Sequence, residues 1–177
     1  QAHSTPEFDA AKAPRLDPEV WPEARMLKAR RNWSREYVNT TVDCLMQMYG
    51  PYTTHYLVEQ TMRCMAVQYT HELKKDAAVN GNNAAAVAEF FARMLRSQHQ
   101  NFQVKEISDT HIQIELASFL PFNGQVSEGL RQASFSFQTM AAWIMNGRIS
   151  VTRKSLPDTF NPEREVWEIK DTGRWLY

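Results

Sequence analysis

The chain of 177 residues is 43% hydrophobic and 23% charged, a composition typical of one folded globular domain and unlike that of a disordered chain. Its 20 basic and 20 acidic residues balance to a formal net charge of +0, so no overall field favours a nucleic acid, an anionic membrane or an acidic substrate. No apolar run reaches the length of about 18 residues that would indicate a membrane span. We therefore expect a soluble domain with no nucleic-acid partner and no membrane-spanning segment.

Residues 1–31 are predicted to form an extended N-terminal arm with little regular structure. Prolines recur along this segment, and proline disrupts the interior of a helix because it lacks the backbone N–H. The polar start QAHSTPEFDAAKAP is typical of an exported protein after cleavage of its signal peptide, although trimming would leave a similar start. We expect export to the periplasm, with the cytoplasm as the alternative.

Three helices are predicted at the start of a single α+β domain that covers residues 32–177. The first spans residues 34–49 after the N-cap Ser34, and Gly50 followed by Pro51 ends it. The second, central helix continues to about Asp76 and carries apolar residues on more than one side. The third spans about residues 84–97, and its inward-facing residues are Val87, Phe90, Phe91, Met94 and Leu95.

After the third helix, apolar and polar residues alternate, which predicts strands. A first hairpin turns at residues 108–110, and a second joins strands around Val151 and Trp167. Between the hairpins a fourth helix is predicted over about residues 130–144, ending before Asn146 and Gly147. The order three helices, hairpin, helix, hairpin predicts an α+β fold in which the helices pack on one face of a small antiparallel sheet.

The chain has two cysteines, Cys44 and Cys64. On antiparallel helices that meet near Gly50, their distances from the turn differ by about seven residues, or about 10 Å along the helix axis. That offset exceeds the Cα separation of about 7 Å that a disulfide tolerates. We therefore expect two free thiols, buried as small apolar side chains.

His55 is the candidate general base, and Glu59 is its candidate orienting group. A carboxylate four residues further along a helix can orient an imidazole and raise its basicity. The alternative is an ordinary surface ion pair in the first turn of the central helix. The histidines lack the spacing of metal ligands, and the chain has no glycine-rich phosphate loop, so we expect no metal and no cofactor.

Large aromatic side chains are the candidate substrate-binding groups. Such side chains line small-molecule pockets, but they also fill plain cores. We expect a cavity between the central helix and the sheet, bordered by His55 and at least two of the aromatic residues of the third helix, the fourth helix and the last strand. The candidates are Tyr52, Tyr56, Phe90, Phe91, Trp143 and Trp167.

The segments MYGPYTTHYLVEQTMRCMAVQYTHELKKD and FSFQTMAAWIMNGRISVTRKSLPDTF, with EREVWEIKD after them, carry a family resemblance. In the order and spacing of its elements, the chain resembles the L-2-amino-thiazoline-4-carboxylate hydrolase family and, beyond it, vinyl-reductase-like ligand-binding domains. The resemblance covers about residues 32–171. Members of such families often carry cysteines in the sheet region, whereas this chain has none after Cys64. The resemblance therefore transfers no catalytic residue.

Three functions stay open at this point. The leading hypothesis is a small hydrolase-like enzyme that opens a C–N bond of a small cyclic or amide-like substrate, with His55 as general base on water. The second is a non-catalytic binding protein for a hydrophobic or aromatic small molecule. The third is a protein-interaction module whose exposed aromatic face docks a partner or, in a homo-oligomer, a second copy.

Overall fold

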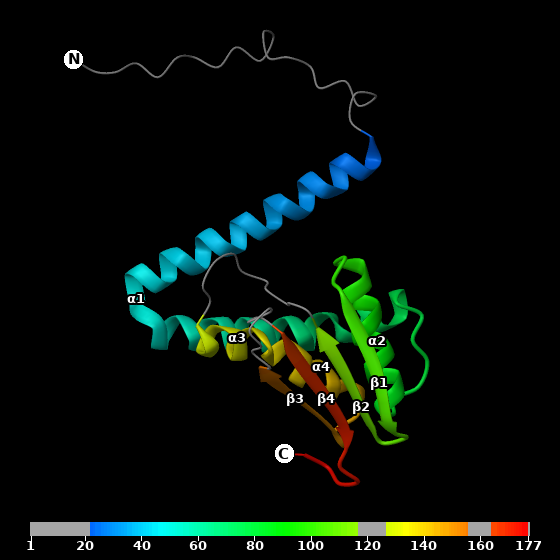
Figure 1. The fold of residues 1–177 in the computed structure, drawn as a ribbon. Helices are drawn as coiled ribbons and strands as arrows, with labels where there is room; N and C mark the ends of the chain where they lie inside the picture. The colour runs from blue at the N-terminus through cyan, green and yellow to red at the C-terminus, as the bar shows by residue number, and fades with distance from the viewer. Residues whose placement is uncertain (1–21, 117–126, 156–163, 177) are drawn as a thin grey trace, which may run out of the picture. The chain divides into compact units, whose positions relative to one another are not determined.

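The computed structural model describes residues 22–116, 127–155 and 164–176, in which four helices and four strands follow one another (Figure 1). The chain divides into two compact units, Gln1–Val38 and Asn39–Tyr177, and the division falls inside the first helix. No helix in the described ranges is both long and apolar enough to cross a membrane. The elements are α1 (Glu23–Asp76), α2 (Ala84–Ser97), β1 (Phe102–Ser108), β2 (His111–Leu116), α3 (Glu128–Ser134), α4 (Ser136–Met145), β3 (Ile149–Ser155) and β4 (Glu165–Asp171).

The N-terminal unit is helical from Glu23, so the predictions of an extended arm up to residue 31 and of a helix start at Ser34 are wrong. Pro22 stands immediately before the first turn, where its missing N–H removes no helical bond, and its carbonyl accepts from the backbone N–H groups of Arg25 and Met26. The Ser34 hydroxyl donates to the Arg30 carbonyl one turn earlier and caps nothing. The arm's residues 1–21 lie outside the described residues.

Gly50 breaks α1, as its sequence with Pro51 predicts. Gly50 has a φ of 75° and a ψ of 175°, a conformation that a helix does not contain and that favours glycine. The buried Thr54 hydroxyl donates to the Gly50 carbonyl at 2.8 Å and fixes the start of the next helical segment. Val42 before the break and Val58 after it share one apolar cluster, so residues 39–49 pack beside residues 51–76.

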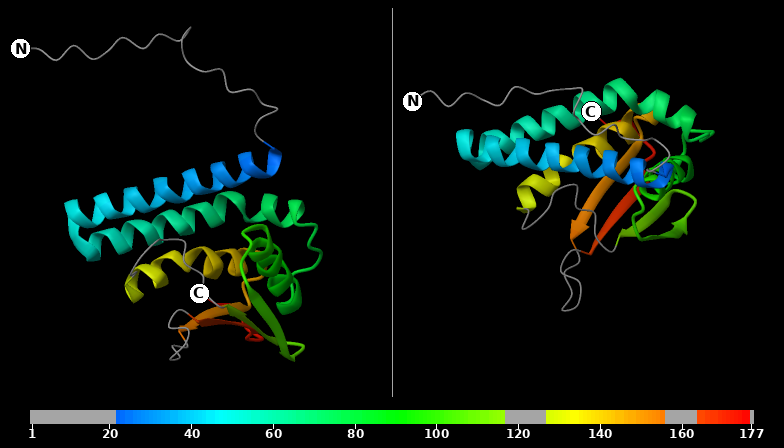
Figure 2. Two further views of the ribbon diagram at one scale, coloured as in Figure 1. Left: turned by 45° about the horizontal axis from the view of Figure 1, so that its top comes forward. Right: turned by 90° about the horizontal axis from the view of Figure 1, so that it is seen from above.

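The core lies between the helices and one face of the sheet. Phe90 and Phe91 of α2 are buried, as predicted, and the Phe91 ring meets the Trp167 ring edge-on with centroids 5.8 Å apart. The Asn83 side chain caps α2 by accepting from the Ala86 N–H at 2.9 Å, which orients this apolar face. Figure 2 shows α2 and α4 between the sheet and residues 51–76 of α1. The predicted fourth helix is two helices, α3 and α4, which are separated at Phe135.

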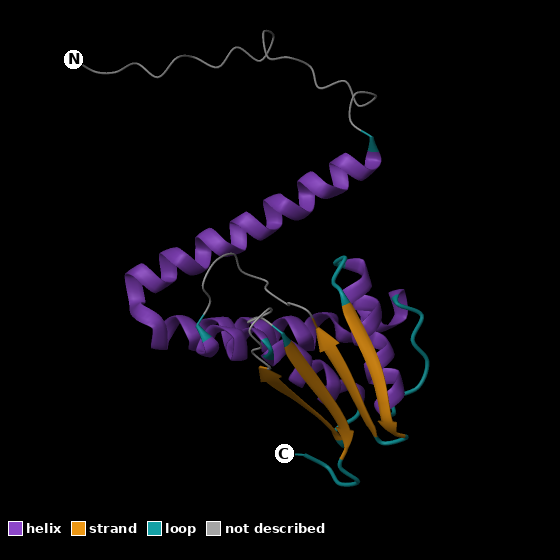
Figure 3. Cartoon of the chain, viewed as in Figure 1, coloured by secondary structure: helices purple, strands orange, loops and turns teal. Residues whose placement is uncertain are grey.

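The four strands form one antiparallel sheet in the order β1-β2-β4-β3, and α2, α3 and α4 lie on one face of it (Figure 3). Both predicted hairpins are present, with Ile114 paired with Trp167 across β2 and β4. Inward side chains such as Ile114 and Ile169 are buried, whereas charged side chains such as Glu168 and Lys154 lie on the outer face. The predicted α+β fold class is therefore confirmed.

Cys44 and Cys64 are free, as predicted, but both are exposed. The prediction that they are buried is wrong because α1 buries a different side, where Val42, Val58 and Ala66 lie.

Candidate functional site

His55 lies half-buried against the start of α3. Its Nε2 is 3.1 Å from the Ser127 hydroxyl oxygen. The ring also lies against Gly129, because a Cβ added there would be 2.5 Å from His55 Cε1. The Ser127 hydroxyl accepts from the Leu130 N–H at 3.2 Å as the N-cap of α3. A hydroxyl beside an imidazole is the geometry of a nucleophile and its base, but this hydroxyl also holds a helix end.

The predicted pairing of His55 with Glu59 is not formed in the described part of the chain. The Glu59 carboxylate instead accepts from Arg63 Nε at 3.0 Å and pairs with the same guanidinium at 2.9 Å. His55 and Arg63 both lie four residues from Glu59, one before it and one after it, so either could contact its carboxylate. In the structure the carboxylate binds Arg63. His55 is therefore oriented by Ser127, 72 positions away in sequence.

The six predicted substrate-binding residues lie in three different environments. Phe90, Phe91 and Trp167 are closed in the core, while Tyr52 and Tyr56 stand on the surface of α1. Trp143 on α4 is 48% exposed and lines a pocket. The structure therefore does not bring these six side chains together at one site.

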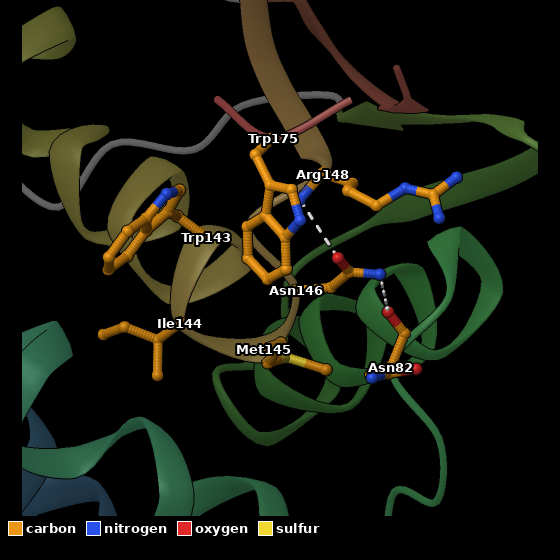
Figure 4. A pocket seen from close by; sticks show the side chains of 8 residues that line it. Asn82, Trp143, Ile144, Met145, Asn146, Arg148 and Trp175 are labelled. Atoms are coloured by element: carbon orange, nitrogen blue, oxygen red, sulfur yellow. Dashed lines mark hydrogen bonds between the residues drawn. The ribbon is translucent and has the colours of Figure 1, made fainter. Parts of the chain in front are cut away.

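The pocket beside Trp143 has a volume of about 570 Å³ and lies at the turn between the end of α4 and the start of β3 (Figure 4). The sequence predicted only one of its residues. Trp175 was missed because it lies in the C-terminal segment without a periodic pattern, and Asn146 and Gly147 were interpreted only as a helix end. The described lining residues are Asn82, Trp143, Ile144, Met145, Asn146, Gly147, Arg148 and Trp175.

A buried ion pair joins the last two strands. Arg153 of β3 and Glu165 of β4 each expose 2% of their side chain, and Arg153 Nε lies 2.6 Å from a Glu165 carboxylate oxygen. The same guanidinium bonds Glu128 of α3 at 2.5 Å, and the Trp167 indole N–H donates to Glu165 at 2.7 Å. Burial alone would lower the pKa of Arg153, but the bond to Glu128 and the attraction of Glu165 raise it above its ordinary value.

The contacts of this network are those of a structural interaction that holds β3, β4 and α3 together. Each carboxylate and the guanidinium already have partners within the network, and the two most buried groups are closed off from solvent. In the described ranges, no group of three or more His, Cys, Asp or Glu side chains is placed to hold a metal ion.

The segment of α1 after Gly50 exposes apolar side chains around the helix, and the three most exposed lie on one side of it. Tyr52 is 88%, Tyr56 57% and Val67 62% exposed. At 100° per residue these three positions fall within about 60° of one another around the helix axis, and the Glu59–Arg63 ion pair lies between them. We call the surface of these five residues the α1 aromatic face.

The fold and these surfaces define an α+β module with helices on one side of an antiparallel sheet. No family model and no curated protein sequence matches the chain. A solved structure has the same fold: a trafficking protein particle complex subunit 3 from Naegleria fowleri, covalently bound to palmitic acid. It has a TM-score of 0.52 and 13% identity, with 85% of this chain and 99% of that chain covered. At this identity the likeness shows the fold alone, and the resemblance to the thiazoline carboxylate hydrolase family stays a prediction.

Proposed function

We propose that the chain is a protein-interaction module that binds another protein subunit through the α1 aromatic face. The observation that carries this proposal is the exposure of Tyr52, Tyr56 and Val67 on one side of a single helix. Apolar side chains gathered on one surface are typical of interaction sites, and Tyr is enriched at the centres of protein interfaces.

The chemistry of the face favours a partner surface that is apolar and without net charge. Glu59 and Arg63 neutralise each other at 2.9 Å, so the face attracts neither a basic nor an acidic partner strongly. Two tyrosine rings offer a large contact area and hydroxyl groups for hydrogen bonds at the rim. That the structural neighbour is a subunit of a multi-protein particle supports a different protein, rather than a second copy, as the occupant.

The hydrolase hypothesis has less support from the geometry. Its proposed base, His55, is held by the N-cap Ser127, and its proposed orienting group, Glu59, is bound to Arg63. Three of its six proposed binding residues are enclosed in the core. A role for His55 in the packing of α3 against α1 accounts for these contacts.

The test is site-specific crosslinking followed by reconstitution. A photoreactive amino acid replaces Tyr56, and a control replaces the exposed Gln132 of α3, in the cells that make the protein. The expected result is one crosslinked protein at Tyr56 that is missing at Gln132. The purified partner should then lose at least about tenfold in affinity for the Tyr52→Ser, Tyr56→Ser variant, because the loss of two hot-spot aromatics removes about 2 kcal/mol or more. Gln132→Ser should bind normally.

Three results would count against the proposal. The first is the same crosslinks at both positions, or none at either. The second is unchanged affinity of the double tyrosine variant for the purified partner. The third is sedimentation in which the chain alone self-associates and the variant does not, which would make a second copy the occupant.

A further inference from the structure

We infer that the pocket at the end of α4 binds a flat, uncharged aromatic molecule between the Trp143 and Trp175 side chains. The site is separate from the α1 aromatic face and does not depend on the proposed function. Figure 4 shows both indole rings bordering the same hollow, with Ile144 and Met145 beneath them.

The two indoles are exposed yet held in place. Trp143 is 48% and Trp175 64% exposed. The Trp143 Nε1–H donates to the Leu176 carbonyl at 3.0 Å, and the Leu176 N–H donates to the Gly147 carbonyl at 2.8 Å. These bonds hold the C-terminal segment over the turn after α4, so both rings are positioned before any ligand arrives. Such preorganisation reduces the entropy lost on binding.

Gly147 makes the approach of the rings possible. A Cβ at this position would overlap the Trp175 ring carbons Cε3 and Cζ3 and would lie 3.5 Å from Trp143 Nε1. Any other residue would therefore displace the Trp175 ring. The pocket exists because the turn carries no side chain at this one point.

The polar groups of the pocket select a neutral ligand. Of the lining residues in the described ranges, only Arg148 is charged, and it pairs with Asp171 at 3.3 Å while pointing away from the indoles in Figure 4. The Asn146 amide is fixed by bonds to the Asn82 carbonyl and the Arg148 N–H, both at 3.0 Å. The Asn82 side chain can hydrogen-bond a ring N–H or hydroxyl group.

The size and walls of the pocket favour an aromatic ring over an aliphatic one. A volume of about 570 Å³ lies within the range of about 300–1,000 Å³ that holds small ligands. The π-faces and edges of two indoles make geometry-specific contacts with another aromatic ring, and an aliphatic ring of similar size forms only dispersion contacts.

The experiment is a titration of the full chain with indole, followed through the indole N–H resonances of its tryptophans by NMR. Cyclohexanol is the matched non-aromatic probe. Indole should shift the Trp143 and Trp175 signals with a dissociation constant below about 1 mM, while the buried Trp167 signal stays in place. Cyclohexanol should bind at least about tenfold more weakly.

Two pocket variants and one control complete the test. Trp175→Leu removes one wall, and Gly147→Ala displaces Trp175 without removing any indole, so each should weaken indole binding at least about tenfold. Trp33→Leu, in the N-terminal unit, should leave binding unchanged, and an unmoved Trp167 signal reports that each variant is folded. Equal binding of cyclohexanol, indole binding that survives in both pocket variants, or tighter binding of a proline-rich peptide than of indole would overturn the inference.

Discussion

Gly129 and His55 illustrate how two residues far apart in sequence determine each other's environment. The imidazole occupies the place that a side chain at position 129 would need, and its Nε2 reaches the N-cap Ser127. The contact joins α1 to the start of α3, beside the cluster formed by Val42, Val58 and Leu130. His55 therefore stabilises the packing of two helices through its shape as well as through its hydrogen bond.

We predict that Gly129→Ala lowers the free energy of unfolding by about 0–2 kcal/mol, because the crowding of His55, which would cost about 1–3 kcal/mol in a packed core, is partly offset by a gain of about 1 kcal/mol in helix propensity. Because the added Cβ would meet the His55 ring at 2.5 Å, His55→Ala in the same chain should recover part of this loss. Urea unfolding of both single variants and the double variant measures the coupling. Losses that simply add would show that the two residues do not share this contact.

The identity of a residue did not reveal whether it lies in the core or on the surface. Phe90, Trp167 and Tyr52 were equivalent candidates by type, yet two are buried and one is 88% exposed. The sequence singled out His55 by its position on the helix, but Ser127, which contacts it in the structure, is remote in sequence, so no helical spacing could identify this partner. A local sequence pattern predicts which side chains are neighbours along one helix. It does not predict which faces of that helix are covered by other elements.

Elements with a strong period were predicted well. Residues close together in the sequence are enough to recognise the alternation in β1 and β2 and the apolar face of α2. The break at Gly50 follows from backbone sterics alone. The helix over residues 23–33 was missed because its apolar residues have no clear period, and the prolines before it suggested a continuing arm. Helix formation there starts directly after Pro22.

The Arg153 network ties three elements together: β3 through Arg153, β4 through Glu165 and α3 through Glu128. Since both groups of the Arg153–Glu165 pair are 2% exposed, neither can recover hydration if its partner is removed. The network therefore fixes the position of α3 against the last hairpin. Replacing one of its two buried members should lower the stability of the fold strongly.

We predict that Arg153→Ala lowers the free energy of unfolding by about 3–5 kcal/mol, because it leaves the buried Glu165 carboxylate without a cation, and that Glu165→Gln costs less, because Arg153 keeps its bond to Glu128. Arg63→Ala, which breaks the exposed Glu59–Arg63 pair, should cost only about 0.3–0.5 kcal/mol and serves as the control. Chemical denaturation at neutral pH measures all three. Equal small losses would mean that the Arg153 pair remains hydrated in solution.

At the scale of the whole molecule, the charged side chains are unevenly distributed although the formal net charge is +0. The outer face of the sheet carries two carboxylates surrounded by cations. Glu115 pairs with Lys105 at 2.6 Å and with Arg164 at 2.9 Å, and Glu168 pairs with Lys170 at 2.9 Å and with Lys154 at 3.2 Å. All but the Glu168–Lys170 pair, which lies within β4, join residues far apart in sequence, so they stabilise the folded sheet and are absent from an unfolded chain.

Those cations lower the pKa of both carboxyl groups. The hydrogen bond from Lys105, followed by that from Arg164, lowers the pKa of Glu115 below 4.5, and the bond from Lys170 is the largest cause for the lowered pKa of Glu168. As pH falls, the unfolded chain therefore takes up protons on these two groups before the folded chain does. Their contribution to stability is complete above about pH 5 and is lost as pH falls through the folded pKa values.

We predict that the free energy of unfolding declines between pH 5 and about pH 3, and that Glu115→Gln with Glu168→Gln makes this decline shallower. At pH 7 the double variant should be less stable by about 0.2–1 kcal/mol for each ion pair that it removes, since the cations of these pairs are exposed to solvent. The difference between the two proteins should shrink as pH falls below 5, because the unfolded natural chain takes up protons on these two carboxyl groups before the folded chain does. Urea midpoints at pH 7, 5, 4 and 3 give both curves, and parallel curves would show that these two carboxylates do not govern the acid sensitivity of the fold.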